Sequence, residues 1–153
     1  MNIDIVKASQ EHLQAIAEFN QQMALETENK ELPTETILAG VRKMFEDESL
    51  GFYLVALDEE GNVLGCLGVT FEWSDWRNGL FWWIQSVYVG KGHRSKGVFS
   101  KMYAAVKSQA QSQMNVCGIR LYVEKDNKTA YRTYVRLGMI ETEYHLMEEE
   151  FGS

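Results

Sequence analysis

The sequence has few of the residues that staple small secreted proteins or form flexible linkers. Its 153 residues include one proline and two cysteines, which excludes Pro-rich linkers and a disulfide framework. The longest purely apolar run, Phe52 to Leu57, is far too short to span a membrane. Charged residues interrupt the N-terminal apolar positions (Asp4, Lys7 and Glu11). We therefore expect no signal peptide, no membrane partner and a cytoplasmic protein.

The composition is that of a folded globular protein. Hydrophobic residues make up 45% of the chain and charged residues 24%, and the length fits one domain over residues 1–153. Such a chain buries enough surface to fold without a metal or a disulfide. Cys66 and Cys117 both lie in strand-like apolar runs, so we expect buried, reduced thiols. No group of His, Cys and acidic residues has metal-ligand spacing, so we expect no metal.

Acidic residues are missing from one long segment. The net charge is −7, yet no Asp or Glu occurs between Trp76 and Val123. That segment contains seven basic residues: Arg77, Lys91, Arg94, Lys96, Lys101, Lys107 and Arg120. The remaining residues include 8 basic and 22 acidic ones. An acidic chain with one basic segment is a poor nucleic-acid binder, and it favours a small, highly charged anion instead.

Hydrophobic periodicity predicts alternating strands and helices. In chain order we expect a strand near Ile3 and Ile5, a helix capped by Ser9, a helix from Pro33-Thr34, strands Phe52–Leu57, Val63–Trp73 and Leu80–Val89, a helix from Val98 to Met114, a strand Gly118–Glu124, a helix Asn127–Leu137 closed by Gly138, and one or two closing strands in Met139–Phe151. This order predicts an α/β (α+β) fold. Its sheet is mixed and mostly antiparallel, is flanked by helices, and has one parallel strand pair joined through a helix.

A basic, glycine-containing loop over residues 90–97 connects a strand to a long helix. The first N–H groups of a helix lack intrahelical partners and attract anions such as phosphate. Gly97 lets a ligand approach the backbone, while Arg94 and Lys96 add positive charge. The sequence has neither a Gly-Lys-Ser/Thr phosphate loop nor a dinucleotide fingerprint. ATP and NAD are therefore disfavoured, and an adenine-nucleotide binder is the weaker interpretation.

Two motifs resemble those of the GNAT superfamily of acetyl-CoA-dependent N-acetyltransferases. The segment Arg94-Ser95-Lys96-Gly97-Val98-Phe99 is similar to the family's Gln/Arg-x-x-Gly-x-Gly/Ala loop, with Phe99 in place of the small residue. The segment Asn127 to Met139 resembles Asn-x-x-Ala-x-x-x-Tyr-x-x-x-Gly-Phe, with Met139 in place of Phe. The resemblance implies a GNAT-like fold in which the two parallel strands splay apart.

The resemblance also implies a set of acetyl-CoA contacts. The cosubstrate lies in the gap between the splayed strands, along Val87, Tyr88 and Val89, and the backbone groups of Val87 and Val89 pair with its pantetheine arm. Asn127 lies near the thioester arm, and Tyr134 lies beside the sulfur as general acid. The implied pyrophosphate contacts are Arg94, Ser95, Lys96, Gly97, Val98 and Phe99.

The acceptor prediction depends on aromatic and acidic residues that precede the loop. Trp73 and Trp76 alternate with Glu72 and Asp75, and aromatic rings beside carboxylates suit an amine. Strand alternation places Glu72 with Gly68 and Thr70 on one side of its strand, opposite Trp73. We predict Glu72 as the general base; a solvated edge carboxylate is the alternative.

These observations predict transfer of acetyl from acetyl-CoA to a primary amine by direct attack in a ternary complex. The acceptor is a small molecule or a peptide. The alternative is a GNAT-fold regulatory module that binds acyl-CoA without turnover. The sequence leaves a homodimer open as a further partner.

Overall fold

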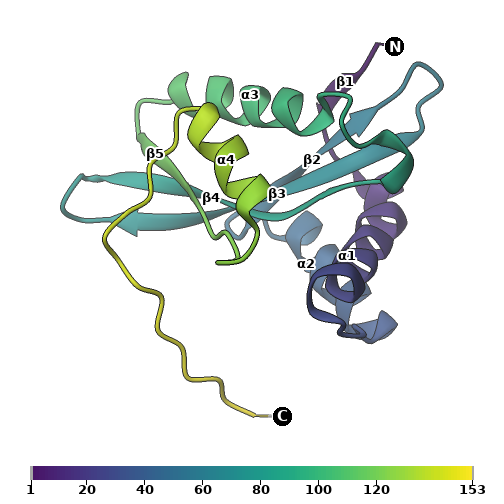
Figure 1. The fold of residues 1–153 in the computed structure, drawn as a ribbon, viewed down its shortest axis with the longest axis horizontal. Helices are drawn as coiled ribbons and strands as arrows, with labels where there is room; N and C mark the ends of the chain where they lie inside the picture. Colours follow the sequence, from purple (N-terminus) through teal and green to yellow (C-terminus); the bar gives the residue numbers. More distant parts are fainter. Residues whose placement is uncertain (1, 153) are drawn as a thin grey trace. The chain divides into compact units, whose positions relative to one another are not determined.

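The structure is a computed structural model that describes residues 2–152 (Figure 1). Two compact units make up the chain, residues 1–122 and residues 123–153. The first unit contains the sheet and three long helices, and the second contains one helix, α4. No helix within the described part of the chain is long and apolar enough to cross a membrane.

Five strands form one sheet in the order β1-β2-β3-β4-β5. Their bounds are β1 Asp4–Lys7, β2 Gly51–Leu57, β3 Val63–Ser74, β4 Gly79–Val89 and β5 Val116–Leu121. Strands β1 to β4 pair antiparallel, whereas β4 and β5 pair parallel. The expected mixed sheet with one parallel pair is therefore confirmed.

Helices cover both faces of this sheet. A short 3₁₀ helix, Gln10–His12, leads into α1 (Leu13–Glu28), and α2 spans Thr34–Glu46. Tyr53 and Val55 of β2 pack with Ile16 of α1 and Val41 of α2 in one core cluster. Helix α3 (Val98–Gln111) covers the opposite face (Figure 1). Alternate strand residues thus face α1 and α2 or face α3.

In the second unit, α4 spans Lys128–Arg136. The side chain of Asn127 accepts a hydrogen bond from the Ala130 N–H group at 3.1 Å, so Asn127 is the predicted N-cap. At the other end, Gly138 has a φ of 107°, and the N–H group of Met139 donates to the carbonyl of Tyr134 at 3.0 Å. This arrangement is a Schellman motif, so the predicted stop at Gly138 is confirmed.

Two predictions were wrong. Residues 139–152 form no strand, because a strand exists only where a neighbouring strand supplies hydrogen-bond partners. Cys117 is exposed, since β5 is the last strand of the sheet and its apolar residues are only partly covered. Cys66 is fully buried as predicted, and this burial raises the pKa of its thiol to about 12.

Candidate active site

Strand β4 continues beyond the point at which its pairing with β5 ends. The parallel pairing runs from Leu80 opposite Val116 to Ile84 opposite Leu121. Beyond that point, residues 85–89, here called the β4 end, pair within the described residues with β3 alone. The backbone of the β4 end is therefore open on the side where β5 stops.

A β-bulge lies at the start of this open stretch. Gln85 is opposite Gly68 and Tyr88 is opposite Cys66, so β4 has one more residue than β3 between these pairs. Ser86 has a φ of 54°, which is rare for a residue with a side chain. Bulges bend a strand and increase its local twist. This bulge therefore contributes to the parting of β4 from β5.

The peptide groups at the β4 end point in defined directions. The N–H group of Gly90 donates to the carbonyl of Leu64 in β3 at 2.9 Å. Because successive residues of a strand point their polar groups to opposite edges, the carbonyl of Val89 points away from β3. It accepts a hydrogen bond from Nε of Arg94 at 2.9 Å. Val89 thus directs its carbonyl to the open side of β4, where Arg94 binds it.

The basic loop, residues 90–97, ends at the first turn of α3. Gly97 is the N-cap, with a φ of 80° and no side-chain cap bond, and its carbonyl accepts from the N–H group of Lys101 at 3.1 Å. A Cβ atom added to Gly97 would meet nothing within 4 Å. Open space therefore adjoins helix N–H groups that have no intrahelical partner, an arrangement that suits a phosphate.

The other predicted loop residues surround this turn. Ser95 has a φ of 64° and is exposed, as is Lys96. Val98 is buried, and the ring of Phe99 lies 6.2 Å from the ring of Tyr103. Phe99 is therefore held by packing along α3, which accommodates the larger side chain at this position.

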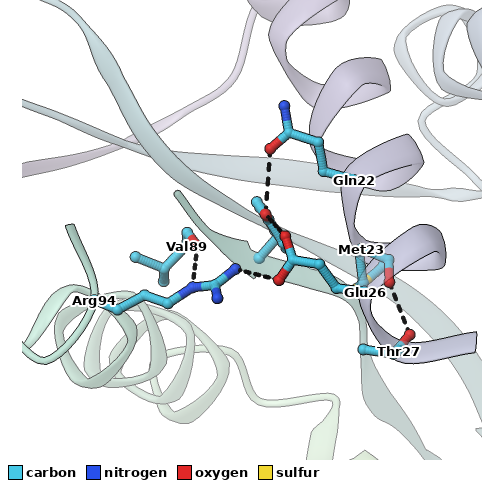
Figure 2. Close-up of polar contacts among 7 residues, drawn as sticks. Gln22, Met23, Glu26, Thr27, Val89 and Arg94 are labelled. Carbon is cyan, nitrogen blue, oxygen red and sulfur yellow. Dashed lines mark hydrogen bonds and ion pairs between the residues drawn. The ribbon is translucent and has the colours of Figure 1, made fainter. Parts of the chain in front are cut away.

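Arg94 does not extend freely into solvent. Its Nη2 atom lies 2.8 Å from Oε1 of Glu26, and its guanidinium lies 5.0 Å from the centre of the Tyr88 ring. Figure 2 shows Arg94 between Val89 and Glu26. The guanidinium of Arg94, a residue of the basic loop, thus contacts both the β4 end and helix α1.

Glu26 is the centre of this polar cluster. The hydroxyl of Tyr88 donates to Oε2 of Glu26 and lies 3.2 Å from Oε1 of Gln22. The hydrogen bond from Tyr88, followed by that from Arg94, lowers the pKa of Glu26. Burial and the neighbouring Glu26 raise the pKa of Tyr88. Tyr88 therefore turns its side chain toward α1, while its backbone forms part of the β4 end.

No pattern in the sequence indicated Glu26. It lies on an amphipathic helix that also contains Glu18 and Glu28, and no local pattern distinguishes the three. Only the packing of α1 against β4 brings Glu26 to Tyr88.

Glu72 lies in a second polar cluster. Its Oε1 atom accepts hydrogen bonds from Nε1 of Trp83 at 2.9 Å and from Nη1 of Arg120 at 2.8 Å. The bond from Trp83 and then that from Arg120 lower the pKa of Glu72. The Glu72 side chain is 45% exposed. It is thus an ionised, accessible carboxylate, but a weaker base than an unpaired one.

Aromatic rings flank Glu72 on the same face of the sheet. The rings of Trp83 and Tyr122 lie 4.5 Å apart, and the guanidinium of Arg120 lies 3.6 Å from the centre of the Phe81 ring. Trp76, in contrast, is 88% exposed in the β3–β4 turn. The aromatic side chain that hydrogen-bonds the carboxylate is therefore that of Trp83.

The remaining predicted residues, Asn127 and Tyr134, belong to the second unit. Asn127 caps α4 through its side chain. Tyr134 lies in the last turn of this helix, two residues before its end, and burial raises the pKa of its phenol. Its hydroxyl is therefore protonated at neutral pH.

Comparisons with known proteins extend these observations. The sequence model of the Acetyltransferase (GNAT) family matches residues 13–139. The crystal structure of a possible acetyltransferase from Clostridium difficile 630 is 42% identical, with all of both chains covered and a TM-score of 0.92. A comparison with curated protein sequences finds no match.

More distant structures share the fold. AAC(6')-Iy, solved in complex with a bisubstrate analogue of CoA, is 15% identical, with 99% of this chain and 100% of that chain covered and a TM-score of 0.79. A transcriptional regulator from Bacillus halodurans C-125 is 19% identical, with 98% and 100% covered and a TM-score of 0.82. At these identities the likeness shows the fold alone.

Proposed function

Because the chain belongs to the GNAT acetyltransferase family, whose members use acetyl-CoA, we propose that it acetylates a primary amine of a small molecule or peptide in the cytoplasm. Residues 1–153 act together as one acetyltransferase domain. The observation that carries this proposal is the parting of β4 from β5 beyond Ile84, beside the uncapped first turn of α3.

The described residues suit acetyl-CoA as cosubstrate. Backbone groups of Val87 and Val89 at the open β4 end would pair with its pantetheine arm as a neighbouring strand would. The N–H groups from Ser95 to Phe99, together with the open space at Gly97, would hold the pyrophosphate. Asn127 would contact the thioester arm.

The reaction is a direct acyl transfer. The neutral amine nitrogen attacks the thioester carbon, a C–N bond forms and the C–S bond breaks. Tyr134 donates its phenolic proton to the leaving thiolate. The amine loses a proton to a base, for which Glu72 is the proposed residue. The carboxylate of Glu72 also attracts the ammonium form of the acceptor beside Trp83.

Thermal-shift titration tests the cosubstrate. Acetyl-CoA and CoA are expected to raise the melting temperature by mass action, by an amount that grows with ligand concentration, whereas ATP and NAD leave it unchanged. Stabilisation by ATP or NAD, with none by CoA, would overturn the assignment of the loop.

Turnover tests the regulatory alternative. Thiol release from acetyl-CoA is measured across a panel of primary amines, with a no-amine reaction as control. Amine-dependent release supports transfer. If CoA binds but no amine in a broad panel accelerates release, the regulatory module becomes the better interpretation.

A further inference from the structure

The backbone carbonyl of Val89 already has a hydrogen-bond partner in the structure. Nε of Arg94 lies 2.9 Å from this oxygen, which is the distance at which an N–H group of a neighbouring strand would lie. The carbonyl points to the open side of β4, where β5 has ended. The Arg94 guanidinium therefore occupies part of the space that a strand-like ligand at the β4 end needs.

Helix α1 holds the guanidinium in this place. The Nη2 atom of Arg94 donates to Oε1 of Glu26 at 2.8 Å, and the guanidinium lies 5.0 Å from the centre of the Tyr88 ring. The hydroxyl of Tyr88 donates to the other oxygen of Glu26, so both carboxylate oxygens have a donor. In Figure 2 the Arg94 side chain extends from the loop toward α1. Arg94 thus has three partners, which are Val89, Tyr88 and Glu26.

These contacts compete with the proposed cosubstrate site. The pantetheine arm is proposed to pair with the backbone of Val89, and the pyrophosphate with the first turn of α3, which begins just after the loop of Arg94. A guanidinium that is paired with a carboxylate on α1 attracts an anion less strongly than a free one. The side chains of Arg94 and Glu26 are 42% and 26% exposed, so the pair can separate at modest cost.

We propose that Glu26 is a positioning residue that holds Arg94 on the Val89 carbonyl in the free protein, and that CoA displaces Arg94 from this carbonyl when it binds. This inference rests on the proposed function, because it assumes that the β4 end binds CoA. The released guanidinium is then available to the pyrophosphate at the first turn of α3. The apparent association constant for CoA is the intrinsic one multiplied by the fraction of molecules in which Arg94 is released.

Calorimetric titration with CoA compares the wild type with Glu26→Gln. The variant is expected to bind CoA about two- to fivefold more tightly, which corresponds to the loss of one exposed ion pair. General damage to the fold would weaken binding instead. Glu18→Gln, which removes an exposed charge from the same helix, is expected to keep the wild-type affinity.

The outcome separates this inference from the proposed function. If the wild type binds CoA and Glu26→Gln binds it equally or more weakly, Glu26 does not restrain Arg94 and the inference is overturned. If the wild type binds no CoA, the proposed function is overturned, and the inference with it.

A double-mutant cycle separates the release of Arg94 from simple charge repulsion. Loss of the Glu26 charge would by itself favour an anionic ligand. In an Arg94→Ala background there is no guanidinium to hold, so the further change Glu26→Gln is expected to have little effect on CoA affinity. A gain of the same size in both backgrounds would mean charge repulsion alone and would overturn the proposal.

NMR observes the contact in the wild-type chain, so this test needs no gain of affinity in a variant. A nuclear Overhauser contact between the Nε–H proton of Arg94 and the ring protons of Tyr88 is expected in the free protein. The Arg94 signal is assigned by its loss in Arg94→Lys. Saturation with CoA is expected to remove the contact. A contact that persists in the CoA complex would show that Arg94 stays at the β4 end, and would overturn the proposal.

Discussion

Arg94 and Glu26 are 68 residues apart in the sequence, and their side chains form an ion pair of 2.8 Å. The pair joins the loop before α3 to helix α1, across the end of β4. Glu26 therefore positions the guanidinium of Arg94. The resemblance to the family motif alone would place this guanidinium at the pyrophosphate of the cosubstrate.

Replacement of this cation tests its part in binding. Arg94→Ala is expected to weaken CoA binding several-fold, more at low salt than at high salt, because exposed charge contacts are screened. Calorimetric titration at two salt concentrations measures the effect. Lys107→Ala, on an exposed part of α3, is the matched control. Equal affinities for wild type and Arg94→Ala at low salt would exclude a role for the guanidinium.

Glu26 makes stability depend on pH. Its pKa is lowered from 4.5, mainly by the hydrogen bond from Tyr88, so its contribution is fully present above pH 4.5 and is lost as the pH falls through the lowered value. Glu26→Gln is expected to reduce the free energy of unfolding by about 1 kcal/mol at pH 7.

Denaturant titrations of wild type and Glu26→Gln across pH 3–7 measure this difference, which should shrink below pH 4.5. Glu18→Gln, an exposed change on the same helix, should have little effect at any pH. If the loss of unfolding free energy in Glu26→Gln is the same at every pH, the pH dependence does not come from the lowered pKa of Glu26.

Gly97 is expected to be required for two reasons: the positive φ at the start of α3, and the approach of the cosubstrate phosphate to its first turn. Gly97→Ala forces a side chain into a φ of 80°, at a cost of about 1–2 kcal/mol of stability. It also adds a methyl group where the phosphate approaches, so we expect CoA affinity to fall about tenfold or more.

Gly61→Ala is the control for Gly97→Ala, because Gly61 has a similar φ of 84° and equally open surroundings in the β2–β3 turn. It should lose similar stability and keep its CoA affinity. A similar loss of affinity in both variants would mean that strain alone, and not access, explains the effect.

Tyr134→Phe removes one hydroxyl and keeps the ring. If Tyr134 is the general acid, kcat falls by about 10²–10⁴-fold while CoA affinity is nearly unchanged. Steady-state kinetics with a confirmed amine measure the change, and Tyr131→Phe in the same helix is the control. An unaltered kcat, with chemistry at least partly rate-limiting, would refute the role.

The hydrogen bonds to Glu72 give a test of the proposed base. Glu72→Gln is expected to lower kcat/KM for amines with CoA binding preserved. Arg120→Gln removes one cause of the lowered Glu72 pKa, so the acidic limb of the pH–rate profile should move to higher pH. If the acidic limb of Arg120→Gln matches that of the wild type, Glu72 is not the base. A wild-type kcat/KM in Glu72→Gln would exclude it as well.

Local patterns predicted most of the elements, although β5 was expected at Gly118–Glu124 and lies at Val116–Leu121. The apolar, aromatic and β-branched residues of 52–57, 63–73 and 80–89 predicted β2, β3 and β4 with bounds correct to within one residue, because strand propensity depends on short runs of neighbouring residues. The cap at Asn127 and the stop at Gly138 were also correct, since each depends on residues within one helical turn.

Long-range contacts could not be predicted in this way. The bond between Tyr88 and Glu26 spans 62 residues and depends on how α1 packs on β4. The exposure of Cys117 follows from the place of β5 at the sheet edge. Residues 139–152 form no strand because no strand within the described residues pairs with them. Each depends on which element lies beside which, and no short stretch of sequence contains that information.

The bulge at Ser86 reverses the alternation of β4 side chains between the two faces of the sheet. Before it, odd-numbered residues of β4 such as Trp83 share a face with Glu72; after it, the even-numbered Tyr88 turns to that same face, opposite Cys66. In a strand with no bulge, the five-residue spacing from Trp83 to Tyr88 would put their side chains on opposite faces and turn Tyr88 from α1 toward α3. Trp83 and Tyr88 therefore lie on one face because β4 has one more residue than β3 at the bulge.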